Sequence, residues 1–332
     1  MEKHNDPYYF LKRQVLWALL GTAAMFVTRK MDYRHLEKYT YYIVGITFLM
    51  LIAVMIPGLG KEVGGARRWL ILGYLTFQPS ELAKFALVLF IAKSLVKRAD
   101  QLKNFAYGYL PKLIVLGFFF VPILFQPDFG TAIIICAVTF TMLFVAGLRL
   151  KFLVYSVLAI VPFIVSAIMG AEYRTRRIIA FLEPWQDPTN TGYQAIQSFY
   201  AFGRGGIFGT GIGASSQKLF YLPEAHTDFI FSVIGEELGL IGTLLIVLLF
   251  SVLVWRGFVI AYRAKDSFGT HVAIGLTLLF GIQAFVNMGV AVGLLPTKGL
   301  TLPFISMGGS SLIVLMFSMG ILLNISEQPV QH

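Results

Sequence analysis

Long apolar runs recur along the whole chain, and short polar stretches separate them. Each run of roughly 17 to 25 residues is long enough to cross about 30 Å of hydrocarbon as a helix. An open sheet would leave unpaired backbone groups in lipid, whereas a helix satisfies its own. The pattern therefore predicts about nine spans, near residues 14–28, 40–57, 80–96, 110–125, 129–147, 152–170, 229–255, 268–294 and 304–325.

Basic side chains gather in the short loops that follow the first, third, fifth and seventh spans. They are Arg29, Lys30, Arg34 and Lys38, then Lys97, Arg98 and Lys103, then Arg149 and Lys151, and finally Arg256, Arg263 and Lys265. Because short basic loops stay in the cytoplasm, nine spans put the C-terminus inside and the N-terminus outside. The longest outer loop is then residues 171–228. The polar first dozen residues lead into a chain full of spans, so we expect no signal peptide.

Composition supports a membrane protein. The chain has 332 residues, 57% hydrophobic and 13% charged, with a mean hydropathy of +0.74. The net charge of +10 is better explained by orientation and lipid phosphates than by nucleic acid. The single cysteine, Cys136, excludes an intrachain disulfide. We expect an all-α polytopic helical membrane protein with one domain over residues 1–332.

Several polar groups border the apolar spans on the predicted outer side, where they are functional candidates by default. Arg67 and Arg68 precede Trp69, and such a group binds a phosphate headgroup or serves as an interfacial anchor. Glu81 and Lys84 share one helix face, so they contact a substrate or form a buried ion pair that locks helices.

Two aspartates stand at the entry of predicted helices. Asp128 lies in a very short turn between two spans, and capping of the next helix is its favoured role. Asp228 follows Glu224 and His226 at the mouth of a span, where it is either a general base or, like Thr227, a helix cap. The spacing leaves both roles open.

Glycines and hydroxyls fill two further segments. The glycine-rich stretch 203–213 lacks the Lys-Ser/Thr of a phosphate loop, so packing of a loop against helices is its favoured role. Lys298 stands in the last outer loop, before Ser310 and Ser311. Small residues there permit close helix packing, which leaves Lys298 as the least explained side chain.

Six motifs together resemble the SEDS (FtsW/RodA/SpoVE) family in order and spacing. They are Gly65-Ala66-Arg67-Arg68-Trp69, Gln78-Pro79-Ser80-Glu81-Leu82-Ala83-Lys84, Gln126-Pro127-Asp128, Gly192-Tyr193-Gln194, Leu222 to Phe231, and Lys298 to Ser311. The resemblance covers nearly the whole chain and is closer to the division branch than to the elongation branch. It implies the SEDS fold and a peptidoglycan glycosyltransferase of the inner membrane that uses lipid II, with Asp228 essential.

The resemblance also implies a class B penicillin-binding protein and other divisome proteins as partners. The residues themselves give the substrate-binding candidates, which are Arg67, Arg68, Trp69, Glu81, Lys84, Glu224, His226, Lys298, Ser310 and Ser311. Family members have ten spans, so we expect that the first is missing from this chain. Met307 stands where the family usually has tyrosine.

An outer active face constrains the chemistry, because nucleotide sugars are absent there. A polyprenyl-pyrophosphate sugar brings its own leaving group, and a single inverting displacement needs one base, Asp228, and cations for the pyrophosphate. Candidate cations are Arg67, Arg68, Lys84, Lys298, the arginines 174, 176 and 177, or a divalent Mg²⁺ or Mn²⁺ held by Asp228 or Glu224. A lipid II flippase and a non-catalytic scaffold remain alternatives.

Overall fold

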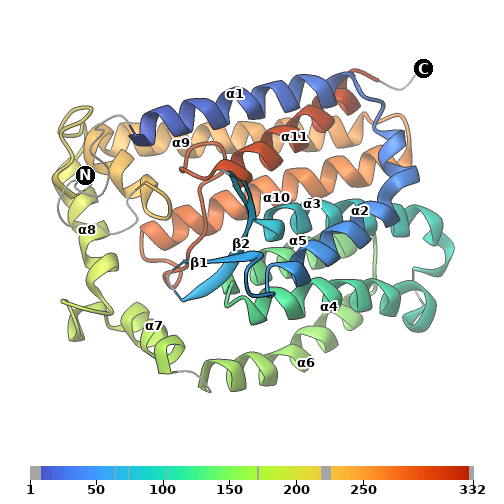
Figure 1. Cartoon of the computed structure of the whole chain (residues 1–332), viewed down its shortest axis with the longest axis horizontal. Coiled ribbons are helices and arrows are strands. Elements are labelled where there is room, and N and C mark those ends of the chain that lie inside the picture. Colours follow the sequence, from blue (N-terminus) through green and yellow to red (C-terminus); the bar gives the residue numbers. More distant parts are fainter. Residues whose placement is uncertain are drawn as a thin grey trace. The chain divides into compact units, whose positions relative to one another are not determined.

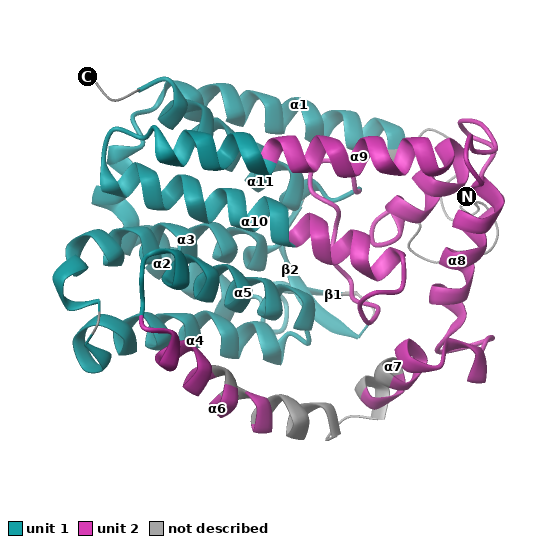
Figure 2. Cartoon of the chain, turned by 180° about the vertical axis from the view of Figure 1, so that it is seen from behind, with its two compact units in different colours: residues 1–148, 254–282, 307–332 teal, residues 149–253, 283–306 magenta. Residues whose placement is uncertain are grey.

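The computed structural model of the chain describes residues 9–63, 65–73, 75–102, 104–169, 172–217 and 226–328. The chain forms two compact units, which Figure 2 colours separately. The first unit comprises residues 1–148, 254–282 and 307–332, and the second comprises residues 149–253 and 283–306. Two long helices, α9 (Ile230–Tyr262) and α10 (Ser267–Ala291), contribute one end to each unit.

A thoroughly buried helix, α3 (Pro79–Lys97), organises the first unit. Its neighbours are α2 (Arg34–Ala53), α4 (Leu110–Phe125), α5 (Phe129–Val145) and α11 (Gly309–Ser326). Leu89, Ile91 and Ala92 point in different directions from α3, and all three are 0% exposed. A helix that is buried on all sides belongs in the interior of a bundle. The first helix, α1 (Tyr9–Lys30), packs along α11 (Figure 1).

A small antiparallel sheet stands where the sequence predicted only an outer loop. Its strands β1 (Gly60–Val63), β2 (Ala66–Leu72) and β3 (Leu75–Phe77) pair in the order β1-β2-β3. Leu70 pairs with Gly60 on one side and with Phe77 on the other. Gly65 and Gly73 lie at the two reversals with φ values of 76° and 63°, which favour glycine. The strands are too short for a clear alternating pattern, so the sequence interpretation missed them.

The second unit adds helices inside the long predicted outer loop. It contains α6 (Leu150–Met169), α7 (Glu172–Leu182), a 3-10 turn at Pro184–Gln186 and α8 (Tyr193–Gly205). The prediction of a long loop over residues 171–228 was therefore incomplete, because two helices lie in it. Ser198 of α8 donates a 2.5 Å hydrogen bond to the carbonyl oxygen of Ala291 at the end of α10.

Helix α9 is interrupted by a glycine. Gly239 has φ 67° and ψ −162°, so the helical backbone breaks there and resumes. An added Cβ at Gly239 would lie 2.4 Å from the amide nitrogen of Gly209, and one at Gly209 would lie 2.2 Å from the carbonyl oxygen of Glu237. The glycine-rich stretch thus packs tightly against α9, as the sequence favoured.

Each of the nine predicted spans lies on a helix. Five helical stretches in the described part of the chain are long and apolar enough to cross a membrane: α2, Phe105–Phe125 (which includes α4), α9, α10 and α11. Helix α5 is apolar but shorter, α3 carries charged side chains along its length, and α1 carries them near its two ends. The last span begins at Gly309 rather than at residue 304, because the preceding residues form turns, with Phe304 at φ 65°. The chain is an all-α, multi-pass membrane protein apart from its small sheet.

Candidate functional site

Asp228 lies in a turn of residues 226–229 that leads into α9 in the second unit. The helix begins at Ile230, so Phe229 rather than Thr227 or Asp228 occupies the capping position. Phe229 is 2% exposed and packs with Val233 and Val290. A buried aromatic side chain therefore anchors the turn, while Asp228 and His226 keep partly exposed side chains.

A buried amide on α10 ties this turn to the segment of residues 298–306. The Nδ2 atom of Asn287 donates to the carbonyl oxygen of Asp228 at 2.9 Å and to that of Leu300 at 2.6 Å. Asn287 is 1% exposed. Its two donors thus join two loops that lie far apart in the sequence.

A buried serine makes a second tie between the same two loops. The hydroxyl of Ser306 donates to the carbonyl oxygen of Thr227 at 2.5 Å and accepts from the amide of Leu302 at 2.7 Å. Ser306 is 4% exposed. Because each tie uses backbone atoms of the turn, neither consumes the carboxylate of Asp228.

The carboxylate of Asp228 lies against Gly299, beside Lys298 in the chain. A Cβ built at Gly299 would stand 3.2 Å from Oδ2 of Asp228, closer than most real Cβ contacts. Lys298 is partly exposed. The structure thus brings the Asp228 turn and the Lys298 loop together, two candidates that the sequence could name but not join. Glu224 lies outside the described residues.

Glu236, two turns into α9, anchors the loop that precedes residues 218–225. It is 0% exposed and accepts hydrogen bonds from the hydroxyl of Ser215 and from the amides of Ser216 and Gln217, the last two at 3.1 and 3.3 Å. The guanidinium of Arg204 lies 3.8 Å from the same carboxylate. Several donors stabilise this buried charge.

Glu81 and Lys84 form a buried ion pair in the first unit. The Nζ atom of Lys84 lies 2.9 Å from Oε1 of Glu81, and their side chains are 2% and 7% exposed, respectively. Oε2 of Glu81 is buried and has no hydrogen-bond partner among the described residues. Lys84 also lines a narrow apolar crevice with Val138 and Met142. The geometry gives the ion-pair interpretation its support, and substrate contact by the pair stays a prediction.

Asp128 caps α5, as the sequence favoured. Its Oδ1 atom accepts from the amide of Thr131 at 3.2 Å, and Oδ2 accepts from the hydroxyl of Ser80 at 3.3 Å. Ser310 accepts from the amide of Gln78 at 3.1 Å. Three of the sequence motifs therefore meet in one polar cluster that holds the starts of α3, α5 and α11 together.

The two arginines of β2 serve different neighbours. Arg68 donates to the carbonyl oxygens of Gln126 and Pro127 at 2.9 and 2.6 Å, so it stabilises the turn before Asp128. Arg67 pairs with Glu62 of β1 at 3.1 Å, and both side chains are well exposed. Phosphate binding by these arginines and Trp69 stays a prediction, as does contact by Ser311, which is 7% exposed near the start of α11.

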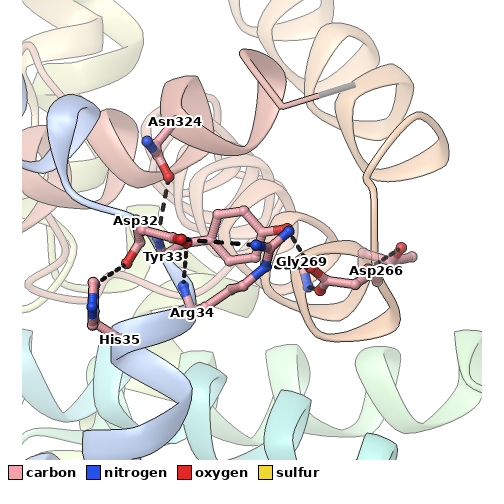
Figure 3. A network of polar contacts seen from close by, with 8 residues as sticks. Asp32, Tyr33, Arg34, His35, Asp266, Gly269 and Asn324 are labelled. Atoms are coloured by element: carbon pink, nitrogen blue, oxygen red, sulfur yellow. Dashed lines mark hydrogen bonds and ion pairs between the residues drawn. The ribbon is translucent and has the colours of Figure 1, made fainter. Parts of the chain in front are cut away.

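A further polar network of the first unit, the Tyr33 cluster, joins the turn before α2 to the start of α10 and the end of α11 (Figure 3). The hydroxyl of Tyr33 donates to Oδ2 of Asp266 at 2.5 Å, and its amide donates to Oδ1 of Asn324 at 3.1 Å. Burial, helped by the bond to Asp266, raises the pKa of Tyr33.

Hydrogen bonds lower the pKa of Asp266 in this network. Desolvation raises its pKa, but bonds from the Gly269 amide, the Tyr33 hydroxyl and Arg34 outweigh that effect, so the pKa falls below 3.8. No sequence motif pointed to this network.

The described residues do not offer a protein-built metal site. No group of three or more His, Cys, Asp or Glu side chains gathers among them. Of the three arginines in the long outer loop, Arg176 is exposed on α7, and the side chains of the other two are outside the description.

Comparison with known proteins places these features in a family. The model of the FtsW, RodA and SpoVE family, described as cell cycle proteins, matches residues 1–331. The chain is 51% identical over 327 residues to a probable peptidoglycan glycosyltransferase FtsW of Geobacter metallireducens, covering 98% of this chain and 87% of the relative.

Two solved structures are similar over nearly the whole chain. A chain of a peptidoglycan synthase complex in which polymerization and crosslinking are coordinated matches with a TM-score of 0.81 and 32% identity, over 98% of this chain and 92% of that one. The rod shape determining protein RodA of Thermus thermophilus matches with a TM-score of 0.73 and 30% identity, over 98% and 90%.

Proposed function

Because this chain belongs to the FtsW/RodA/SpoVE family, we propose that it is a peptidoglycan glycosyltransferase with Asp228 as its general base. It polymerises lipid II into glycan strands during septal cell-wall synthesis. The observation that carries the proposal is the position of the Asp228 carboxylate against Gly299, beside Lys298, in a turn that Asn287 and Ser306 hold by its backbone. A single displacement at a pyrophosphate-linked sugar needs one carboxylate as base and a cation for the leaving group.

In the proposed step, the acceptor hydroxyl of one lipid II attacks the anomeric carbon of the glycan on a second. The new bond forms between that oxygen and the anomeric carbon, and Asp228 takes the hydroxyl proton. The bond from the anomeric carbon to the pyrophosphate oxygen breaks, and the lipid pyrophosphate leaves with the electron pair. The anomeric centre inverts, so no second carboxylate is required as a nucleophile.

We assign Lys298 to the departing pyrophosphate, because it precedes in the chain the glycine that lies against the Asp228 carboxylate. The other basic candidates stay predictions: Arg67, Lys84 and the remaining donors of Arg68. The described residues do not fit a metal site of their own, so we assign no step to Mg²⁺ or Mn²⁺.

The basic short loops support an orientation in the bacterial inner membrane with the Asp228 turn outside and the C-terminus in the cytoplasm. A class B penicillin-binding protein is the proposed transpeptidase partner, together with other divisome proteins. The similarity to a chain of a peptidoglycan synthase complex supports this partnership.

The test is polymerisation of labelled lipid II by the purified protein, alone and with its partner. We expect Asp228→Asn to fold normally and to lose roughly 10²- to 10⁴-fold in rate, the usual worth of general-base help. If the protein were a flippase, neither the unchanged protein nor Asp228→Asn would make glycan. If it were a scaffold, glycan would form only where the partner itself polymerises lipid II. Normal polymerisation by Asp228→Asn would overturn the assignment of the base.

A further inference from the structure

Asn287 is a polar residue in an apolar span. Helix α10 qualifies as a membrane span by length and composition, yet Asn287 is 1% exposed within it. A buried amide in such a helix is costly unless its hydrogen bonds are made. The hydrogen-bond partners of the Asn287 side chain therefore indicate its role.

The Asn287 amide group donates its two N–H groups to backbone carbonyls of two different loops. One bond goes to Asp228 at 2.9 Å and the other to Leu300 at 2.6 Å. Rotating the amide by 180° would turn its oxygen toward the two carbonyl oxygens, all of them acceptors. The orientation of the side chain is therefore determined by its partners.

In this orientation the amide oxygen of Asn287 points into a buried environment. Oδ1 of Asn287 is buried and has no hydrogen-bond partner among the described residues. A hydrophobic side chain would avoid that cost but would leave the two carbonyl oxygens without these donors. The residue is thus suited to donating twice to the two loops rather than to packing.

The hydrogen bonds of Asn287 and Ser306 affect the geometry around the Asp228 carboxylate. Ser306 ties Thr227 to Leu302, and Asn287 ties Asp228 to Leu300, so two adjacent residues of the turn are joined to the same segment. The carboxylate of Asp228 meets Gly299, one residue before Leu300. The Asn287 bridge therefore holds the backbone of Asp228 beside the segment that contains Gly299.

We propose that Asn287 is a positioning residue: its amide holds the backbone of Asp228 and of Leu300 in the register that aims the carboxylate at the acceptor hydroxyl. The proposal rests on the proposed role of Asp228 as base. It assigns Asn287 no contact with the substrate. Loss of the bridge should therefore lower turnover at saturating lipid II and leave the KM for lipid II nearly unchanged.

The primary test is Asn287→Asp in the full-length protein with its partner, because the side chain keeps its shape and retains at most one of the two donors, whether it is charged or protonated. We expect kcat to fall about 10- to 100-fold, the scale of a misplacement of up to about 1 Å. Asn324→Asp is the matched control, because Asn324 is 6% exposed and also bridges backbone groups, the amide of Tyr33 and the carbonyl of Arg29. It should lower the melting temperature and leave kcat unchanged.

Asn287→Ala removes the donors without adding a buried charge and should show the same fall in kcat. A folded variant of either kind with normal kcat would overturn the proposal, as would a raised KM with normal kcat. Failure of both variants to fold while Asn324→Asp folds would also overturn it, because the amide would then serve the fold. If Asp228→Asn itself polymerised normally, the proposed function would fail instead, so the two failures are distinguishable.

Discussion

The polar motif cluster of the first unit and the Asp228 turn of the second unit are held by different kinds of contact. In the first unit, motif side chains bind one another or cap helices: Lys84 pairs with Glu81, and the Asp128 carboxylate accepts from Thr131 and Ser80. In the second unit, Asn287 and Ser306 bind the backbone of the turn that carries Asp228. The carboxylates of the first unit are structural partners, whereas that of Asp228 sits on a turn held by other groups.

This difference separates two ways of keeping a carboxylate near a membrane. A charge that is paired and buried stabilises a helix bundle but has little freedom to exchange a proton. A carboxylate on a turn whose backbone is held by neutral groups is positioned through that backbone. The comparison therefore distinguishes carboxylates that bind other side chains or helix amides from one whose turn is held through its backbone.

The largest expected effect is on the ion pair. Lys84→Met leaves the Glu81 carboxylate buried without its partner, so we expect a loss of about 3–5 kcal/mol in the free energy of unfolding. The double variant Glu81→Gln/Lys84→Met should recover most of that loss, as judged by thermal melting in detergent. Equal instability of the single and double variants would contradict the structural role of the pair.

The same double variant also sharpens the assignment. If it is stable and polymerises lipid II normally, the pair only locks helices. If it is stable and inactive, Glu81 or Lys84 contacts the substrate, and the contrast between the units is weaker than the geometry indicates.

The next effect is on rate alone. Gly299→Ala places a methyl group 3.2 Å from Oδ2 of Asp228, so the carboxylate must shift by a few tenths of an ångström. We expect about a tenfold loss in polymerisation rate with an unchanged melting temperature. Gly45→Ala is the control, because a Cβ at Gly45 in α2 meets nothing within 4 Å. Equal rates for the two variants would show that the space beside Gly299 does not matter.

The smallest effect concerns pH and the Tyr33 cluster. Because the pKa of Asp266 is lowered by folding, its charge adds stability above pH 3.8, and that stability is lost as the pH falls through the lower folded-state pKa. Asp266→Asn should therefore lower the melting temperature at pH 7, by an amount worth less than about 1 kcal/mol for this partly exposed group. The difference from the unchanged protein should shrink toward pH 3, and a constant difference would contradict this mechanism.

Much of the fold could be predicted, because crossing a membrane is a local requirement. Each long apolar run must form a helix whatever it packs against, and all nine predicted spans lie on helices. The role of Asp128 was also local, since an aspartate just before a helix finds the free amides of that helix. The sheet β1-β2-β3 and helices α7 and α8 were missed, because short amphipathic elements at an interface give weak patterns.

Only some residues of the candidate site could be predicted from the sequence. Asp228 and Lys298 stood out because charges beside apolar spans are rare, and Asn287 offered the same signal as an amide within a span. The roles of Arg68 and Ser310 were not visible, since their partners are backbone groups on other elements.

The sequence by itself determined the membrane helices and the identity of the ionisable groups, because hydrophobicity and side-chain chemistry belong to each residue. Only the tertiary structure decided which groups meet. Asn287 reaches the backbone of a residue 59 positions away, and Gly299 lies against the Asp228 carboxylate. Packing between the start of α9 and the end of α10 brings the turn before α9 close to the segment after α10. No local pattern encodes such a contact, since its energy depends on how distant segments fit together.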